Sequence, residues 1–289
     1  MKTLFIASGP ISWASARLRC YWPAEYMQGA WAVTWDEGTA EDCYNADVVI
    51  FQKTFDAAIA KALRGQGKKI YWDLCDPLWW FSPDAVRANL AYVDGVVLSN
   101  ENLRDDFRDW SGGEVKSWCI PDRLKLEHYP LKREHKDVSP VRLIWFGLSV
   151  NRWAVLSALA NLERLAANGY KIELTIMDDV PGPWRVTDAF PIYHVQWSLD
   201  HENEVIAAHD IALLPPYPGP WGIVKSNNRM LTAWACGLPF NNGLHYQSIE
   251  RMVKSAECRT EMAGYGAREL QREYLAEQSA REWEAILCA

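Results

Sequence analysis

Short apolar runs alternate with helix-like patterns along the first half of the chain. The apolar runs are nearly continuous, which is typical of strands in a parallel sheet that is buried on both faces. The predicted strands are Thr3–Ser8, Asp47–Lys53, Lys69–Leu74, Val93–Ser99 and Val115–Ile120. The predicted helices are Ala16–Gln28, Phe55–Arg64, Pro83–Ala91 and Glu101–Trp110. This β–α alternation predicts a doubly wound α/β domain over residues 1–122.

A second alternation follows a stretch that has no apolar period. Residues 123–140 are mixed in charge and include Pro130 and Pro140, so they predict a linker. The later predicted strands are Val141–Leu148, Lys171–Met177, Tyr193–Trp197 and Ile211–Pro215. The later predicted helices are Asn151–Asn168, Glu202–His209, Ser226–Cys236 and one long charged helix, Arg268–Ile286. The pattern predicts an α/β chain with two Rossmann-like domains facing each other across a cleft, the second covering 141–264, and a C-terminal helix in 265–289.

The composition of the 289 residues is that of an ordinary globular protein, with 49% hydrophobic residues, 23% charged residues and a formal net charge of −7. It argues against a disordered chain and against a general polyanion-binding protein, which carries a strong basic excess. Seven scattered cysteines without a CxxC pair predict reduced thiols and no zinc site. No apolar run suits a secretory signal or a membrane span, so we expect a cytoplasmic protein without stable membrane insertion.

The unusual feature of the composition is its 16 tryptophans. A tryptophan buries a large area and keeps one N–H donor, so it suits a core and also a flat ligand such as a sugar or a base. Four lie in predicted strands or helices and are expected to pack there: Trp145, Trp197, Trp234 and Trp283. Four others follow strand ends and are candidate acceptor platforms: Trp13, Trp79, Trp80 and Trp221.

Ligands of open α/β sheets bind at the carboxyl ends of the strands, so the segments that follow the strands are the first candidates. After the first strand, Gly9 permits a tight turn and Ser15 is placed to cap the next helix. Arg17 and Arg19 fall in the first helical turns, where free N–H groups already favour an anion. They predict either an acceptor-side clamp for phosphate or carboxylate, or an ordinary solvated helix start.

The strand Lys69–Leu74 leads into a second candidate segment. Asp73 and Asp76 are followed by aromatic side chains that include Trp79 and Trp80. Carboxylates can hold sugar hydroxyls while an aromatic ring stacks on the sugar. The alternative is a turn in which the aspartates cap the backbone above a hydrophobic plug.

Two segments of the second domain predict a donor site. Gly147 lets the backbone approach a ligand, and Arg152 begins the next helix. After the strand Ile211–Pro215, a loop rich in proline and glycine leads to Lys225 and a helix start. The polar residues of that helix start are Ser226, Asn227, Asn228 and Arg229. A helix N-terminus with two cations about one turn apart suits a diphosphate; the alternative is a loop that is merely stiffened by proline.

Several nucleotide-binding and catalytic motifs are absent from the sequence. There is no G-x-x-x-x-G-K-[ST] P-loop and no G-x-G-x-x-G after the first strand, so a dinucleotide cofactor is disfavoured. There is no G-x-S-x-G segment, and the first histidine is His128, which argues against a Ser-His-Asp hydrolase. We therefore expect no cofactor.

The segment Lys225–Pro239, KSNNRMLTAWACGLP, resembles the nucleotide-sugar-binding segment of GT-B fold glycosyltransferases, in particular the large retaining group 1, or family 4-like, enzymes. The shared pattern is a lysine, asparagines and a basic residue, followed by a helix that ends in Ala-x-Gly-x-Pro. Supporting segments in the same order are Ser15–Arg19, DLCDP at 73–77, Val96–Asn100, and WFG with NR within 145–152. Together these elements span most of the chain.

The resemblance implies transfer of a sugar from a nucleotide diphosphate sugar to a hydroxyl acceptor, with retained configuration and without a metal ion. It implies that Lys225 and Arg152 contact the diphosphate, that the Gly9 loop approaches it, and that the C-terminal helix returns to the N-terminal domain. The paired glutamates of the family fall on Val224 and Thr232. Since the second glutamate binds the nucleoside ribose, Thr232 takes a donor-binding position and the choice of nucleoside is left open.

The resemblance also implies a catalytic region and a set of partners. The family often has a pocket histidine after its fourth strand, and this chain has Asp73 and Asp76 in that part of the sequence. Asp76 is therefore the expected polar group at the reacting centre, with Asp73 as the second candidate. The expected acceptor is a glycan, and a hydroxylated base in DNA is less favoured. The alternative is a catalytically lapsed module that binds a nucleotide sugar or a glycan, as the missing glutamate pair indicates. A metal-binding GT-A transferase is disfavoured because Asp178 and Asp179 form no D-x-D motif.

Overall fold

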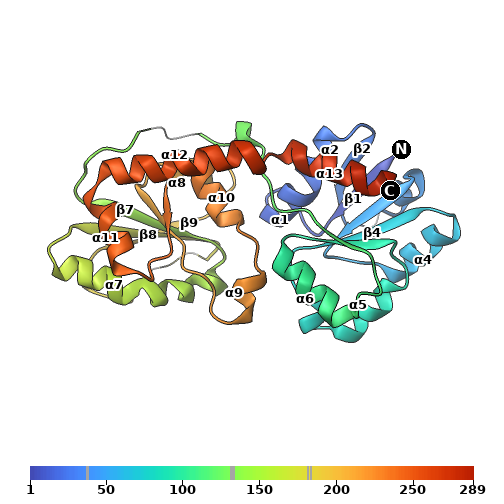
Figure 1. Cartoon of the computed structure of the whole chain (residues 1–289), viewed down its shortest axis with the longest axis horizontal. Helices are drawn as coiled ribbons and strands as arrows, with labels where there is room; N and C mark the ends of the chain where they lie inside the picture. Colours follow the sequence, from blue (N-terminus) through green and yellow to red (C-terminus); the bar gives the residue numbers. More distant parts are fainter. Residues whose placement is uncertain (37–38, 131–133, 181, 183) are drawn as a thin grey trace. The chain divides into compact units, whose positions relative to one another are not determined.

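The computed structural model describes residues 1–36, 39–130, 134–180, 182 and 184–289, and the chain divides into two compact units (Figure 1). Unit 1 contains Met1–Lys125, Ile223–Ser226 and Tyr274–Ala289. Unit 2 contains Leu126–Gly222 and Asn227–Glu273. Within these described ranges, no helix is both long and apolar enough to cross a membrane.

Unit 1 is built on a six-stranded sheet with the order β2-β1-β3-β4-β5-β6, in which every neighbouring pair is parallel. Its strands are β1 (Thr3–Ala7), β2 (Ala30–Thr34), β3 (Val48–Gln52), β4 (Lys69–Leu74), β5 (Gly95–Leu98) and β6 (Ser117–Cys119). Its helices are α1 (Ala14–Ala16), α2 (Trp22–Tyr26), α3 (Thr39–Asn45), α4 (Ala57–Gly65), α5 (Pro83–Leu90), α6 (Glu101–Ser111) and α13 (Ala276–Cys288). A π-helical stretch, Arg17–Tyr21, joins α1 to α2.

The inner strands of this sheet are buried on both faces, as their continuous apolar sequences predict. Every residue of β1, β3 and β5 is buried, whereas every residue of the edge strand β2 is half-buried. The apolar pattern did not predict β2, whose five residues follow shortly after α2. The start of α6 was predicted well, because Asn100 Oδ1 accepts a hydrogen bond from the Leu103 N–H at 2.9 Å.

Unit 2 is built on a five-stranded sheet with the order β11-β10-β7-β8-β9, again with parallel neighbours only. Its strands are β7 (Val141–Phe146), β8 (Ile172–Asp178), β9 (Ile192–Gln196), β10 (Ile211–Leu213) and β11 (Phe240–Asn241). Its helices are α7 (Leu156–Ala167), α8 (Glu202–Ala207), α9 (Pro220–Val224), α10 (Asn228–Ala235), α11 (Tyr246–Lys254) and α12 (Ala256–Glu273). The last two residues of α9 belong to unit 1. The two parallel sheets with their helices confirm the predicted α/β fold with two Rossmann-like parts.

The prediction of one long helix over Arg268–Ile286 is wrong. The chain forms α12, which ends at Glu273, and α13, which begins at Ala276. Between them, Leu275 forms an isolated parallel bridge with Leu124. This pairing takes backbone groups away from the helical hydrogen-bond ladder, so a charged pattern that is continuous in the sequence becomes two helices.

The residues predicted as a linker, 123–140, make specific contacts at their described ends. Arg123 is buried, and its two terminal nitrogens donate to the Glu282 carboxylate at 2.7 and 2.6 Å within unit 1. His135 Nε2 lies 3.0 Å from the carbonyl oxygen of Gly237 within unit 2. Residues 131–133 of the predicted linker lie outside the described residues.

Helix α13 completes the core of unit 1 (Figure 1). Trp283 is 1% exposed, and its ring meets Phe5 edge-on with the centroids 5.7 Å apart. Its second aromatic neighbour, Tyr71, has its centroid at 6.2 Å. Because Phe5 lies in β1 and Tyr71 in β4, the C-terminal helix covers the sheet that the first residues of the chain begin.

We expect Trp283→Ala to lower the free energy of unfolding by about 3–5 kcal/mol, because it opens a cavity among packed aromatic rings. Equilibrium unfolding in urea, followed by circular dichroism, measures this loss. Glu284→Ala, on the exposed side of the same helix, is the matched control, with an expected change within about 0.5 kcal/mol. Equal losses in the two variants would contradict the role of α13 in the core.

Candidate functional site

The start of α10 in unit 2 places Arg229 beside two aromatic rings. The helix begins at Asn228, and the preceding Asn227 makes no side-chain capping hydrogen bond. The guanidinium carbon of Arg229 lies 4.8 Å from the centroid of the Tyr217 ring and 5.9 Å from that of the Trp145 ring. Trp145 lies in β7 and Tyr217 follows β10, and these strands are neighbours in the sheet. The arrangement therefore lies where two parallel strands end.

Two hydrogen-bond donors at this point have no acceptor in the part of the chain that the structure describes. They are the buried Nη1 of Arg229 and the buried indole Nε1 of Trp145. Burial lowers the pKa of the Arg229 guanidinium below its ordinary value, but a guanidinium stays charged in proteins. A partly buried guanidinium without an acidic partner favours an anionic oxygen ligand, because such a ligand supplies the acceptor that Nη1 lacks within the described chain.

Gly147 brings the backbone next to Arg229. Its φ of 153° is unfavourable for a residue with a side chain. A Cβ at this position would lie 3.5 Å from the Trp145 ring and 3.6 Å from Cδ of Arg229, which are ordinary contact distances. Glycine is thus needed here for its backbone conformation rather than for space. Its N–H already donates to the carbonyl oxygen of Met177 at 3.2 Å.

Arg152, the second predicted phosphate contact, is already paired within unit 2. Its Nε donates to Asp178 Oδ2 at 2.6 Å, while His194 Nε2 lies 2.9 Å from Asp178 Oδ1. Asp178 is fully buried, and Arg152 also donates to the carbonyl oxygen of Val180 at 3.3 Å. This network joins β8 to β9. The structure therefore gives Arg152 a partner within the protein, unlike Arg229.

The other predicted donor residues of α10 stay close to Arg229. Asn228 is the first residue of the helix, and Thr232 follows Arg229 by three positions, on the same helix face. Both are half-buried. The helix start thus combines amide, hydroxyl and guanidinium groups, of which only the guanidinium carries a charge.

Asp76 lies between two lysines in unit 1. Its Oδ2 is 2.6 Å from Lys53 Nζ, and its Oδ1 is 2.6 Å from Lys225 Nζ. Burial acts to raise the pKa of Asp76, but the two ammonium groups outweigh burial and hold the pKa below its ordinary value. Asp76 is therefore a carboxylate at neutral pH, suited to accepting and orienting a hydroxyl more than to removing its proton.

Lys53 reaches Asp76 from a strained backbone position. Its φ is 58°, and the Thr54 N–H donates across it to the carbonyl oxygen of Gln52 at 2.7 Å, as in a γ-turn. The Trp72 indole N–H donates to the Lys53 carbonyl oxygen at 3.1 Å and helps to hold this conformation. Strain of this kind amounts to roughly 1–3 kcal/mol and is concentrated at functional sites.

Lys225 belongs to unit 1, whereas the sequence predicted it in the second domain. The Asn100 amide donates to the Val224 carbonyl oxygen at 2.8 Å, and the Asn102 amide donates to the preceding carbonyl oxygen at 3.1 Å. The Val224 side chain is 4% exposed and belongs to the core of unit 1. The start of α6 therefore holds the segment Ile223–Ser226, and the Lys225 ammonium contacts a carboxylate where a diphosphate was predicted.

Arg19 and Asp73 form a buried pair, not the predicted clamp and catalytic carboxylate. Arg19 donates from Nε and Nη2 to the two Asp73 oxygens at 2.8 and 2.5 Å, and from Nη1 to Asp122 at 2.8 Å. Burial acts to lower the pKa of Arg19, but the two carboxylates outweigh burial and raise it. Arg17 is also buried and donates to two carbonyl oxygens of the preceding loop. These arginines hold the π-helical stretch in place.

The four candidate tryptophans differ in exposure. Trp13 is 56% exposed and Trp80 is 37% exposed, whereas Trp221 is half-buried and Trp79 is 2% exposed. Trp79 and Trp80 both donate to Asp106 Oδ2, at 2.7 and 2.9 Å. Trp79 packs in the core of unit 1 and is therefore no platform for a ligand.

The turn after β1 packs against its own tryptophan. A Cβ on Gly9 would lie 2.4 Å from the Trp13 ring, so only glycine lets the ring lie over this turn. Ser15 lies inside α1, and Trp13 occupies the N-cap position, so the predicted serine cap is wrong. Gly9 therefore serves the packing of Trp13, and its predicted approach to phosphates stays a prediction.

No protein-family model and no curated protein sequence matches the chain. Solved structures do match. HepE of Anabaena in complex with UDP and glucose gives a TM-score of 0.71 at 12% identity, over 100% of this chain and 99% of HepE. An alpha-glucosyltransferase in complex with UDP and a 13-mer DNA containing an HMU base gives 0.63 at 11% identity, over 100% of both chains. The chain has the GT-B fold.

The GT-B fold is not limited to one reaction. A protein from Listeria monocytogenes, described as a candidate UDP-N-acetylglucosamine 2-epimerase, gives a TM-score of 0.59 at 10% identity, over 99% of this chain and 96% of that protein. Identities this low show the fold alone. The fold therefore does not by itself determine the reaction of this chain, which depends on the residues at its own site.

Sequence reasoning missed three contributors to the two sites. Lys53 is the last residue of the predicted strand Asp47–Lys53, whereas β3 ends at Gln52, and nothing in the sequence indicates the positive φ of Lys53. Tyr217 lies in the loop between Pro216 and Pro218, where it had no separate signal. Asn100 was predicted only as a helix cap, and its contact with a segment more than a hundred residues away depends on the tertiary fold.

Asp76→Asn is expected to destabilise the protein in a pH-dependent way. The pKa of Asp76 is lower in the folded than in the unfolded protein, so its ion pairs contribute fully above the unfolded value of about 3.9. Their contribution is lost as the pH falls through the lower folded pKa. We expect the variant to be about 1–3 kcal/mol less stable at neutral pH, and the difference to shrink as the pH falls through the lowered folded pKa of Asp76.

Urea unfolding of the wild type and the variant between pH 2.5 and pH 7 measures this difference. Asp109→Asn, an exposed position on α6, is the matched control and should show a small difference throughout. A gap between wild type and Asp76→Asn that stays constant over this pH range would rule out the two-lysine pairing as its cause.

Proposed function

We propose that this GT-B chain transfers a sugar from a nucleotide diphosphate sugar, with UDP-sugars as the first candidates, to a hydroxyl acceptor. The observation that carries the proposal is the Arg229 guanidinium, which has no acidic partner within the described chain and lies beside the unbonded indole N–H of Trp145. Solved structures of the same fold contain UDP or UDP-glucose, which supports a diphosphate as the missing anion.

The chemistry of the donor explains why such an arginine is useful. When the bond between the anomeric carbon and the diphosphate breaks, negative charge develops on the departing phosphate oxygens. A preorganised guanidinium can donate two parallel hydrogen bonds to them, and the free N–H groups at the start of α10 add a favourable dipole. Because these groups can stabilise the departing diphosphate unaided, the proposal includes metal-independent transfer. Retention of configuration stays a prediction.

We propose unit 1 as the acceptor side. Asp76 offers two carboxylate oxygens, each already held by one lysine and each with lone pairs left for an incoming hydroxyl. Its lowered pKa suits orientation of that hydroxyl. A glycan remains the favoured acceptor, and the formal net charge of −7 gives no support to DNA.

A second candidate function is a module that binds a nucleotide sugar without turning it over. The observation that favours it is the pair of positions where the resembling family has glutamates. Val224 is buried in the core of unit 1, and Thr232 carries no charge. Turnover distinguishes this module from a transferase.

Arg229→Gln is expected to weaken the binding of UDP by roughly 10- to 100-fold, since a hydrogen bond to a charged group contributes about 1.5–3 kcal/mol. Isothermal titration calorimetry with UDP measures the change. Arg251→Gln is the matched control, because it removes the same charge from an exposed pair with Glu261 in unit 2. If both variants bind UDP as the wild type does, the assignment of the diphosphate to Arg229 is wrong.

Incubation with UDP-, GDP- and ADP-sugars, followed by NMR of the sugar signals, tests the reaction itself. A transferase should hydrolyse its donor slowly in the absence of an acceptor, and this turnover should fall in Arg229→Gln but not in Arg251→Gln. Conversion of UDP-N-acetylglucosamine to its C2 epimer would identify an epimerase. Binding without any turnover would identify the binding module.

A further inference from the structure

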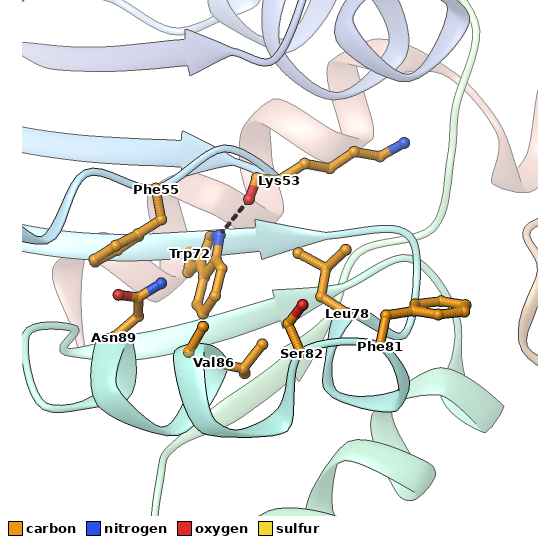
Figure 2. Close-up of a pocket in the computed structure, with 9 residues that line it drawn as sticks. Lys53, Phe55, Trp72, Leu78, Phe81, Ser82, Val86 and Asn89 are labelled. Carbon is orange, nitrogen blue, oxygen red and sulfur yellow. Dashed lines mark hydrogen bonds between the residues drawn. The ribbon is translucent and has the colours of Figure 1, made fainter.

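Unit 1 contains a pocket of about 200 Å³ beside α5, which the proposed function does not use (Figure 2). Its inner wall is made of Phe55, Trp72 and Val86. Trp72 is 2% exposed and Val86 is 3% exposed, so both belong to the rigid core. Phe81 is 67% exposed at the edge of the pocket. The pocket thus has a fixed floor and an aromatic edge in contact with water.

The inner wall presents mainly the carbon atoms of aromatic rings. The ring centroids of Phe55 and Trp72 are 4.9 Å apart, and the two planes are inclined by 46°. The indole N–H of Trp72 is already bonded to the Lys53 carbonyl oxygen, as the dashed line in Figure 2 shows. An aromatic ring inserted here would therefore find ring faces and edges to pack against.

Few polar groups face a ligand in this pocket. Lys53 lines it, but its ammonium group binds Asp76. Ser82 and Asn89 also line the pocket, and their side chains make no hydrogen bond within the described ranges of the chain. The pocket is open to solvent at Phe81, Ser82 and Ala85, so only the hydroxyls of a pyranose ring that face the inner wall would be buried, and there they would find few acceptors or donors. The lining therefore favours an aromatic ring with one or two polar substituents.

The volume points to the same class of ligand. An apolar cavity of roughly 150 Å³ can hold benzene, so about 200 Å³ accommodates a phenyl ring with a short substituent. Neither a disaccharide nor a nucleoside fits completely within such a volume.

We propose that this pocket binds a phenol-type ring, the aromatic part of the acceptor. Naming the ring as acceptor rests on the proposed glycosyltransferase function. Lys53 joins the pocket to the site described above, because it lines the pocket and its Nζ contacts Asp76. Asp76 itself does not line the pocket, so the phenol ring is placed between the aromatic walls and its hydroxyl beyond the Lys53 end, toward this carboxylate. The strained turn at Lys53 serves both the pocket wall and the orientation of Asp76.

The transfer step that follows is balanced without a further reactant. The phenol oxygen forms a bond to the anomeric carbon of the donor sugar. The bond from that carbon to the diphosphate breaks, and its electron pair leaves with the nucleoside diphosphate. The phenol proton passes to the solvent. Asp76 orients the hydroxyl and remains ionised throughout.

Tyrosol, a phenol with a short side chain, is the probe for this pocket. Ala85 and Ala88 are both exposed on α5, but Ala85 lines the pocket and Ala88 does not. Ala85→Leu fills the space that the ring would occupy, and Ala88→Leu adds the same group outside it. Leucine is a good helix former, so both variants are expected to fold.

Saturation-transfer NMR and calorimetric titration of tyrosol test the binding without any donor. We expect tyrosol to bind the wild type and Ala88→Leu equally, and to bind Ala85→Leu at least fivefold more weakly. Methyl α-glucopyranoside, a ring of similar size with several hydroxyls, should not displace tyrosol. Absence of tyrosol binding to the wild type, or equal binding to the two variants, would overturn the proposal.

A second measurement, with UDP-glucose as donor, tests the role of the ring as acceptor. The KM for tyrosol should rise at least fivefold in Ala85→Leu, while hydrolysis of UDP-glucose in the absence of tyrosol stays unchanged. Donor hydrolysis without any transfer to tyrosol in the wild type would overturn the acceptor role. Tyrosol binding that Ala85→Leu abolishes, in a protein that turns over no nucleotide sugar, would instead overturn the proposed function and leave the pocket assignment standing.

Discussion

A parallel sheet joins its strands by crossovers, so the loops at the carboxyl ends of its strands gather along one edge. Both sheets of this chain have polar side chains at that edge. In unit 1, Lys53 follows β3 and Asp76 follows β4, which are neighbouring strands. In unit 2, Gly147 follows β7 and Asp178 ends β8, again neighbours. The positions of the candidate residues thus follow from the strand order of each sheet.

The two edges differ in how their charges are compensated. Unit 1 pairs its cations within the protein: Lys53 and Lys225 share Asp76, and Arg19 is surrounded by carboxylates. In unit 2, Arg152 is paired with Asp178, whereas Arg229 contacts aromatic rings and no carboxylate that the structure describes. A partly buried, uncompensated cation is unfavourable in the free protein. Binding of an anion at Arg229 removes that penalty.

Local patterns predicted the sheets and helices well and the site chemistry less well. The continuous apolar runs of β1, β3 and β5 are buried throughout, because a run without polar positions has no other stable environment in a parallel sheet. The same local reasoning treated Arg19 as a ligand clamp, since an arginine in a first helical turn looks available to an anion. Asp73, which pairs with Arg19, lies 54 residues further along the chain.

The sequence by itself determined the α/β alternation, the extent of most strands and the concentration of polar residues after strand ends, because these depend on residues close together in the chain. Only the tertiary structure decided which of those residues are already bonded to another group of the protein. Lys225 is bound by Asp76, 149 residues away, and the Val224 carbonyl by Asn100, 124 residues away. The charge state and availability of a side chain depend on every group packed against it, and the chain brings those groups together only when it folds.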